Sequence, residues 1–215
     1  IVVSAGGTQE PMDPVRVITN RSSGKMGYAI AEAARDRGAR VTLVAAPTNL
    51  PDPVGVAIRR VATVEQMRGA VLEACQNTDV LIMAAAVSDY RPAQVASQKI
   101  KKDKKVEGVT INLVKNPDFF LEVPKGVLRV GFAAETEDLL GNARAKLKQK
   151  GLTLIAANDI TAPDSGFNVD TNQVTLLDSQ GKEEELPLLS KYEVGHRILD
   201  RVTKLLKRQD SRERN

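Results

Sequence analysis

Short apolar segments alternate with amphipathic ones along most of this 215-residue chain. Apolar residues three or four positions apart predict helices with one buried face, and runs of roughly four to eight apolar residues predict buried strands. The helical pattern occupies residues 24–37, 64–75, 138–150 and 192–206. The strand pattern occupies residues 1–4, 40–44, 58–61, 80–86, 127–133 and 154–157. Such alternation is typical of an α/β protein with a doubly wound, mostly parallel, Rossmann-like sheet.

Two segments depart from this alternation. Residues 109–114 have the two-residue period of a strand but follow a lysine-rich loop rather than a helix, which predicts an added strand arm. Residues 172–189 predict a C-terminal hairpin that turns at Ser179-Gln180-Gly181.

The last predicted helix has one apolar face and is followed by a charged tail. Its apolar residues at helical spacing are Val194, Ile198, Val202, Leu205 and Leu206. No internal repeat and no linker interrupts the chain, so we predict one domain over residues 1–208 and a disordered tail over 209–215. Because the chain starts inside a strand without an initiating methionine, we expect it to be a piece of a longer protein.

The composition, 42% hydrophobic and 27% charged residues, is ordinary for a globular protein. No apolar run approaches the roughly 18 residues of a membrane span, and no signal peptide precedes the first strand, so we expect a cytoplasmic protein without membrane contacts. The single cysteine, Cys75, excludes an internal disulfide and agrees with a reducing compartment. Its position on an apolar helix face favours a core residue over a nucleophile.

The net charge of +4 and pI near 9.2 fit either nucleic acid or a phosphate-rich small molecule. The lysines are concentrated in residues 99–105 and 146–150. There is no tryptophan and aromatic residues make up 3%, which disfavours single-stranded nucleic acid bound by base stacking. We therefore expect no nucleic-acid partner and a small substrate that carries phosphates.

The connection after the first strand predicts a phosphate site. Ligands of open parallel sheets bind beyond the carboxyl ends of the strands, and helix N-termini favour anions. Gly7 follows the first strand, and Ser22, Ser23 and Gly24 open the next helix after a long approach. The alternative is that a serine only caps the helix and Gly24 and Gly27 allow close packing. No acidic residue ends the second strand, which counts against a nicotinamide dehydrogenase.

The stretch MAAAVSDYRP, residues 83–92, ends a strand in small residues that let a ligand lie against the backbone. Asp89 then offers one carboxylate, which suits magnesium held on a triphosphate. The alternative is that Asp89 caps a helix or turn. Downstream, Lys99 to Lys102 fit either a phosphate site or a solvated charge run.

Lys146 and Lys150 lie four residues apart on one helix face, which suits a polyphosphate or a surface stripe. His196, the only histidine, lies in the terminal helix far from the glycine loops, so we expect a structural role. The sequence has no Ser-His-Asp set, no Cys/His cluster and no paired-carboxylate spacing. We infer that the chemistry needs no nucleophile from a side chain.

Taken together, these stretches resemble the phosphopantothenoylcysteine synthetase domain of bacterial coenzyme A biosynthesis. The matches occur in the family's order over about residues 1–180: AGGTQEPMDPVRVITNRSSGKMG, AAAVSDYRP, KIKK, LVKNPD, GFAAET, ANDI and GFNVDTNQV. In that family the domain usually follows a flavin-dependent decarboxylase in one bifunctional chain. The resemblance implies such a fused partner, and no flavin in this domain.

The resemblance also implies a two-step ligation. The carboxylate of 4'-phosphopantothenate attacks the α-phosphate of CTP, which gives an acyl-cytidylate and pyrophosphate. The amine of cysteine then attacks the acyl carbon and expels CMP. Both nucleophiles belong to substrates, so positioning and charge neutralisation by the protein can account for catalysis.

Individual residues take roles from the resemblance. Asn20 matches the asparagine that reaches the reacting acyl-phosphate from a connection near the subunit interface, and Arg16 lies just ahead of it. Lys99 matches the first lysine of the basic motif and would act on CTP phosphates or the acyl-cytidylate. The nucleotide-contacting positions are matched by Met83, Ala84, Ala85, Asp89, Pro117, Asp118, Phe119, Phe120, Phe132, Lys146 and Lys150. Phe119 and Phe120 depart from the family's aliphatic pair.

The resemblance further implies a homodimer. The VKNPD and GFAAET stretches resemble those of bacterial members, which use CTP rather than ATP.

Two other functions compete with the ligase. A short-chain reductase would need a Tyr-x-x-x-Lys pair, but the residues four positions after Tyr28, Tyr90 and Tyr192 are not lysines. A nucleotide sensor built on the ligase fold is opposed by the retained Asn20 and Lys99.

Overall fold

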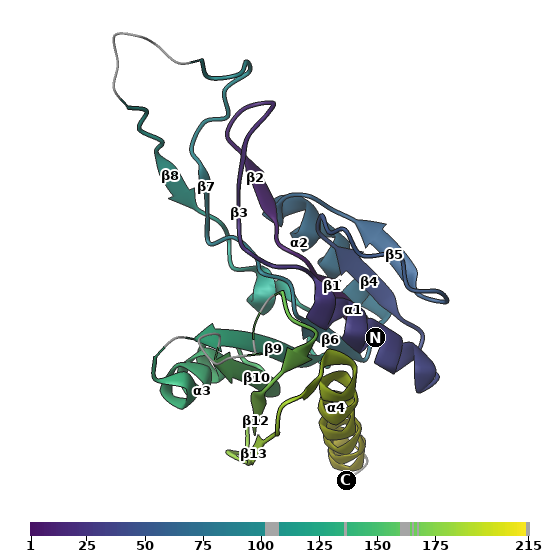
Figure 1. The fold of residues 1–215 in the computed structure, drawn as a ribbon. Helices are drawn as coiled ribbons and strands as arrows, with labels where there is room; N and C mark the ends of the chain where they lie inside the picture. The colour runs from purple at the N-terminus through teal and green to yellow at the C-terminus, as the bar shows by residue number, and fades with distance from the viewer. Residues whose placement is uncertain (102–107, 136, 160–163, 165, 167, 214–215) are drawn as a thin grey trace.

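An eight-stranded sheet forms the centre of the molecule (Figure 1). The computed structural model describes residues 1–101, 108–135, 137–159, 164, 166 and 168–213. The strands lie in the order β13 (Glu183–Glu185), β12 (Val174–Asp178), β10 (Leu154–Asp159), β9 (Leu128–Glu135), β6 (Val80–Met83), β1 (Val2–Ala5), β4 (Thr42–Ala45) and β5 (Ala57–Arg60). All neighbours from β10 to β5 are parallel, while β12 and β13 are antiparallel additions. The doubly wound sheet and the C-terminal hairpin are therefore confirmed.

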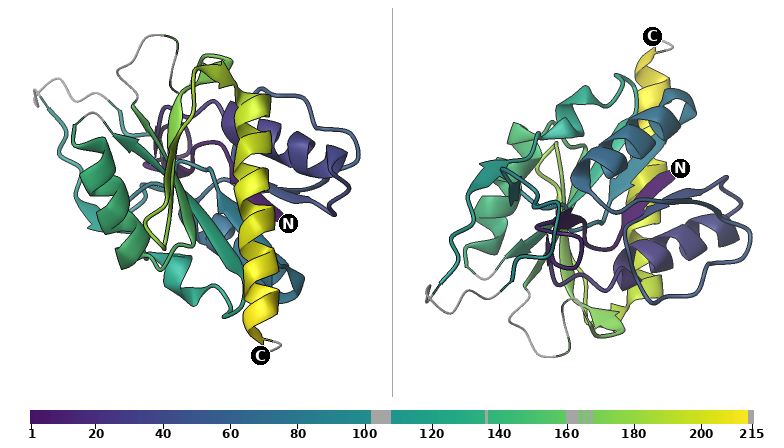
Figure 2. Two further views of the ribbon diagram at one scale, coloured as in Figure 1. Left: turned by 90° about the horizontal axis from the view of Figure 1, so that it is seen from below. Right: turned by 90° about the horizontal axis from the view of Figure 1, so that it is seen from above.

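Helices cover both faces of this sheet (Figure 2). One face packs against α1 (Lys25–Asp36) and α4 (Lys191–Glu213) in a cluster that includes Ile30 and Ile198. The other face packs against α2 (Val64–Ala74) and α3 (Leu139–Gln149). The predicted apolar face of the last helix is buried, apart from the partly exposed Leu206. In the described part of the chain, no helix is long and apolar enough to cross a bilayer.

Cys75 begins the short 3-10 helix η1 (Cys75–Asn77) and is a core residue, as predicted. Only 1% of its surface is exposed, and burial raises the pKa of its thiol to about 11. A thiol that stays protonated at neutral pH is a poor nucleophile. The structure thus favours the core interpretation over the catalytic one.

Two arms leave the sheet where β1 and β6 end (Figure 1). The first is the hairpin of β2 (Gln9–Pro11) and β3 (Val17–Thr19), inside the connection that the sequence showed only as long. The second pairs β7 (Tyr90–Pro92) with β8 (Leu113–Lys115). The predicted strand 109–114 is wrong in its bounds, because antiparallel pairing with β7 begins at Leu113 and residues 109–112 lie outside any strand.

The C-terminal end differs from the prediction in length. Helix α4 reaches Glu213 instead of ending at residue 206, so the tail predicted to be disordered is largely helical where it is described. The reason lies in contacts that sequence alone does not show. Arg208 donates to the side chain of Gln180 at 2.9 Å, and Gln209 donates to the carbonyl of Gly126 at 3.0 Å. A small unpredicted pair, β11 (Thr171–Asn172) with β14 (Leu189–Ser190), precedes this helix.

Candidate active site

The topological switch point of the sheet lies between β1 and β6. From β1 the chain moves to β4 on one side, and from β6 it moves to β9 on the other. Ligands of doubly wound sheets bind at this point, beyond the carboxyl ends of the strands. A cavity of about 340 Å³ lies there, formed by the start of α1, the segment after β6 and the segment 116–120.

The cavity brings together most of the predicted site residues. They come from five separate parts of the chain, which the fold brings together at one edge of the sheet. Those that line the cavity are Ser22, Ser23, Gly24, Met83, Ala84, Ala85, Asp89, Pro117, Asp118, Phe119, Phe120, Phe132, Lys146 and Lys150.

The N-terminus of α1 opens into this cavity. Gly24 is the N-cap residue and has a φ of 80°, a conformation that suits glycine. A Cβ there would also lie 2.7 Å from Cγ2 of Thr48. Neither serine takes the N-cap position, so the interpretation of Ser22 or Ser23 as the N-cap is wrong in its residue. The hydroxyl of Ser23 nevertheless accepts from the backbone N–H of Lys25, the first residue of α1, at 3.4 Å. The close packing expected of Gly27 is confirmed, since a Cβ there would lie 2.6 Å from that of Ala5.

Lys146 and Lys150 face the cavity rather than forming a surface stripe. The ammonium of Lys150 lies 3.4 Å from a carboxylate oxygen of Asp118 and 5.9 Å from the ring centre of Phe120. Asp118 also accepts from the backbone N–H of Phe120, at the start of the 3-10 helix η2 (Phe119–Glu122). This wall therefore presents positive charge beside an aromatic ring.

Asp89 lines the cavity with an exposed carboxylate. Within the described residues, that carboxylate has no hydrogen-bond or ion-pair partner, so nothing supports the interpretation of Asp89 as a cap. The described residues also contain no group of three His, Cys, Asp or Glu side chains that could hold a metal by themselves. A lone carboxylate fits magnesium only when phosphates and water supply the other ligands.

Asn20 and Gly7 lie beside the cavity rather than on its lining. The amide of Asn20 donates to the carbonyl of Ala86, which is itself a lining residue, at 3.2 Å. Gly7 forms a bridge with Ala86, and a Cβ on Gly7 would lie 2.7 Å from the carbonyl oxygen of Asn20. The close approach of these two segments therefore requires a glycine at position 7.

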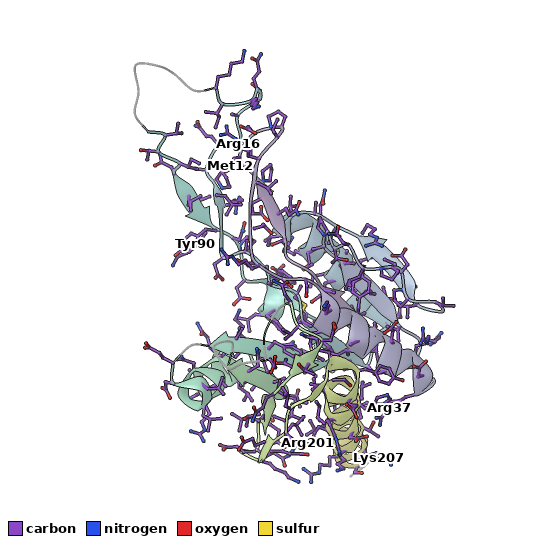
Figure 3. The ribbon with its side chains drawn as sticks, viewed as in Figure 1. Met12, Arg16, Arg37, Tyr90, Arg201 and Lys207 are labelled. Atoms are coloured by element: carbon purple, nitrogen blue, oxygen red, sulfur yellow. The ribbon has the colours of Figure 1, made fainter. Side chains whose placement is uncertain are left out.

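Arg16 lies on the first arm (Figure 3), and Lys99 lies on the second, between β7 and β8. Neither residue lines the cavity. The guanidinium of Arg16 pairs with the buried Asp13 at 2.5 Å and donates to the carbonyl of Ile100 at 2.9 Å. These bonds hold the pKa of Asp13 well below its usual range. Lys99 is exposed next to Ile100, and the lysine-rich stretch 99–105 lies outside the described residues from 102 onwards. The structure thus joins Arg16 to Ile100, the neighbour of Lys99 on the second arm, and places neither Arg16 nor Lys99 on the cavity lining.

His196 lies on α4, outside the cavity lining. Its ring packs edge-on against that of Tyr192, with 4.6 Å between ring centres. This packing agrees with the structural role expected from the sequence.

Comparison with known proteins settles the family. Residues 1–206 match the DNA/pantothenate metabolism flavoprotein C-terminal domain. The chain belongs to this family. It is 47% identical over 210 residues to the coenzyme A biosynthesis bifunctional protein CoaBC of Vibrio vulnificus, covering 96% of this chain and 52% of that protein. It is 44% identical over 216 residues to the CoaBC protein of Bacillus subtilis, covering 99% and 53%. The chain thus spans about half the length of the curated relatives it matches.

A solved structure supports the same assignment. The crystal structure of the C-terminal domain of a coenzyme A biosynthesis bifunctional protein CoaBC superposes with a TM-score of 0.81 at 40% identity. The match covers 96% of this chain and 94% of that one. The recognised family and the fold expected from the sequence are therefore confirmed.

This member of the flavoprotein C-terminal domain family has further cavity residues that the sequence did not single out. They include Lys25, Met26, Asn116, Asn158, Asn172 and Lys191. Lys25 follows directly on the serine-glycine turn and Asn158 lies in the quoted ANDI stretch, so both positions carried a signal. Lys191 carried none, because it lies outside every stretch that resembles the family.

Lys191 is almost fully buried at the first turn of α4. Its ammonium donates to the carbonyl of Gly166 at 2.8 Å, to that of Thr171 at 3.3 Å, and to that of Val169. Burial, with the nearby charge of Lys25, lowers the pKa of Lys191 to about 8. This lysine therefore joins Gly166, which lines the cavity, to the start of α4.

Proposed function

We propose that this chain joins 4'-phosphopantothenate to cysteine, with CTP as the activating nucleotide, in coenzyme A biosynthesis. Its membership of the pantothenate flavoprotein family and its likeness to coenzyme A biosynthesis proteins support this assignment. The observation that carries it is the cavity at the switch point, where the N-terminus of α1, two lysines and the carboxylate of Asp89, unpaired among the described residues, face one space. These are the groups that a reaction of phosphate esters requires.

In the proposed first step, a carboxylate oxygen of 4'-phosphopantothenate bonds to the α-phosphorus of CTP, and the bond to pyrophosphate breaks. In the second step, the cysteine nitrogen bonds to the acyl carbon, CMP leaves with the electron pair, and the amine loses a proton. The protein supplies no covalent nucleophile. In keeping with this, Cys75 is buried with a raised thiol pKa, and His196 lies outside the cavity lining.

Asp89 is the residue we propose for magnesium. Its carboxylate lies on the cavity wall without a protein partner among the described residues, and one carboxylate with phosphates and water suits this ion. Magnesium on the triphosphate would neutralise charge that builds up on the leaving pyrophosphate. Lys146 and Lys150, which also line the cavity, add positive charge to the same space.

Asn20 is the residue we propose at the reacting acyl group. Its amide nitrogen carries two hydrogens, and one of them points to the carbonyl of Ala86. The second is a neutral donor at the cavity edge. Such a donor stabilises an oxygen on which negative charge develops and does not compete as a base.

A homodimer formed through the arms is the assembly we propose. The arms expose apolar side chains, among them Val15 at 63%, Val109 at 66% and Leu113 at 46% exposure. Exposed strands with apolar side chains are typical of surfaces that pair with another chain. The roles proposed for Arg16 and Lys99 depend on an arm reaching a cavity, which pairing of two chains would provide.

We further propose a flavin-dependent decarboxylase as the fused partner domain, since the relatives are named bifunctional and are about twice as long.

Release of pyrophosphate tests this function. We expect CTP and 4'-phosphopantothenate with magnesium to release pyrophosphate, and added cysteine to release CMP and form the amide product. Absence of pyrophosphate release with both substrates would refute the ligase assignment. Pyrophosphate release that needs no 4'-phosphopantothenate would instead indicate nucleotide hydrolysis.

A further inference from the structure

Asn20 and Asp89, the residues proposed for the acyl group and for magnesium, lie on two different connections. Asn20 follows β3 on the first arm, and Asp89 directly precedes β7 on the second. Both residues are exposed, so the backbone that carries them decides where their side chains lie. This placement matters in a reaction that depends on positioning, because a misplacement of about 1 Å can lower a rate by up to about a hundredfold.

A buried pair of hydroxyl groups joins the two connections. Thr8, between β1 and β2, donates from its hydroxyl to Oγ of Ser88 at 3.1 Å. In return, the backbone N–H of Ser88 donates to Oγ1 of Thr8 at 2.9 Å, and the Ser88 hydroxyl donates to the carbonyl of Thr8 at 3.4 Å. Both residues are buried. These bonds replace the water that the hydroxyls lose on folding, and they hold the two segments at one spacing.

Thr8 is bonded once more, on the side of Asn20. The hydroxyl of Thr19 donates to the carbonyl of Thr8 at 2.8 Å. Thr19 ends β3, where it pairs with Gln9, and Asn20 is the next residue. Thr8 therefore contacts the neighbour of Asn20 through its carbonyl and the neighbour of Asp89 through its hydroxyl.

Ser88 is held on the side of Asp89 by a second bonded partner. The side-chain amide of Asn116 donates to the carbonyl of Ser88 at 2.9 Å, and the backbone N–H of Asn116 donates to the carbonyl of Asp89 at 2.8 Å. Asn116 directly follows β8 and lines the cavity. The carbonyls of two consecutive residues are thus fixed, which limits rotation of the backbone that carries the Asp89 carboxylate.

We propose that Thr8 and Ser88 are positioning residues, and that their hydroxyl pair sets the separation between Asn20 and Asp89. Valine and alanine would fill nearly the same buried space. Apolar contacts have no preferred direction, whereas hydrogen bonds between hydroxyls define a distance and an angle. The inference rests on the proposed function, because the roles of Asn20 and Asp89 belong to it.

Steady-state release of pyrophosphate by the full chain, at varied CTP and magnesium concentrations, tests this role. The variants are Thr8→Val and Ser88→Ala, and Thr8→Ser is the conservative variant that keeps the hydroxyl. The matched control is Thr78→Val. Thr78 is half-buried, its hydroxyl donates to the carbonyl of Ala74 at 3.1 Å, and it lies shortly before β6, at the opposite edge of the sheet.

We expect Thr8→Val to lower kcat about tenfold or more with little change in the KM for CTP, and Thr8→Ser to restore most of the rate. Ser88→Ala keeps the backbone N–H bond to Thr8, so it should lower kcat less and raise the magnesium concentration needed for half-maximal rate. Thr78→Val should match the wild type. Wild-type kcat and magnesium requirement in both Thr8→Val and Ser88→Ala would overturn the proposal.

A double-mutant cycle separates positioning from a general loss of stability. If Thr8 acts through Asn20, Thr8→Val should have a much smaller effect in the Asn20→Ala background than in the wild type. Ser88→Ala should likewise change the magnesium requirement less in the Asp89→Asn background. Independent effects in both cycles would show that the hydroxyl pair supports only the fold.

Amide hydrogen exchange is a readout that does not depend on the ligase reaction. Thr8→Val should raise exchange severalfold in residues 17–22 and in residues 86–91, and Thr78→Val in neither segment. Unchanged exchange in either segment of Thr8→Val would overturn the proposal. If the wild-type chain releases no pyrophosphate while Thr8→Val raises exchange in both segments, the proposed function fails and the link between the segments stands. Ser88→Ala carries both measurements if Thr8→Val does not fold.

Discussion

Asn20→Asp should lower the rate of acyl-cytidylate formation by two to three orders of magnitude. The loss of one oriented donor to a developing oxyanion typically costs about a hundredfold in rate, or about 3 kcal/mol. The new carboxylate adds repulsion. At about 4 Å from the reacting oxygens, in surroundings as exposed as those of Asn20, one like charge adds about 1 kcal/mol. The sum, about 4 kcal/mol, corresponds to roughly a thousandfold.

The fold should tolerate this change, because Asn20 is exposed and the substitution removes one side-chain hydrogen bond, that to the carbonyl of Ala86. An exposed hydrogen bond of this kind contributes about 1 kcal/mol or less to the free energy of unfolding. Asn20→Ala removes the donor without adding charge, so its rate should lie between those of the wild type and Asn20→Asp. The difference between the two variants measures the electrostatic part.

The assay is single-turnover release of pyrophosphate from CTP and 4'-phosphopantothenate without cysteine, which reports the first half-reaction alone. Subsequent CMP release on addition of cysteine reports the second. If Asn20→Asp releases pyrophosphate and CMP at wild-type rates, Asn20 does not lie at the reacting centre. A matching loss of thermal stability would instead indicate damage to the fold, which circular dichroism detects.

Four further outcomes are expected. CTP should support turnover with a far higher kcat/KM than ATP, and comparable values would contradict the nucleotide assignment. Asp89→Asn should lower activity and raise the magnesium concentration needed for half-maximal rate; an unchanged requirement would remove Asp89 from the metal site. Lys99→Gln should lower turnover by removing one positive charge near the phosphates, and full activity would show that the arm lysine is not needed. Light scattering at micromolar concentration should give the mass of a dimer, and a fully active monomer would refute pairing through the arms.

The sheet could be predicted because its signal is local. Each inner strand is buried on both faces and so reads as a continuous apolar run, and each helix shows its buried stripe at a period near 3.6 residues. Most of the cavity followed from the same pattern, since strands ending in small residues, such as the segment after β6, mark the edge where ligands bind. The strand pattern and the family resemblance together predict residues 83–85 and Phe132 at the site.

The arms and part of the cavity could not be predicted because their signals are not local. The strands of the β2–β3 hairpin have three residues each, too few to show a period, and contain Pro11. The register of β8 depends on its pairing with Tyr90–Pro92 and not on its own sequence. Lys191 is an ordinary residue in the sequence, and Asn158 lies in the ANDI stretch, which by itself assigns it no role. Their importance arises only when β10 and the start of α4 meet at the cavity edge.

The placement of the second arm bears on how the molecule folds. The arm is inserted between two strands that must pair with each other, since Val80 of β6 lies opposite Leu128 of β9. Without residues 90–115, the connection between β6 and β9 would be less than half as long. Loop closure costs only about 0.6 kcal/mol for each doubling of length, so the insertion lowers the stability of the sheet by roughly 1 kcal/mol or less. Its larger effect is kinetic, because contacts between residues far apart in the chain form late and slowly. The switch point that creates the cavity is therefore completed only after the chain has brought together strands separated by a whole arm.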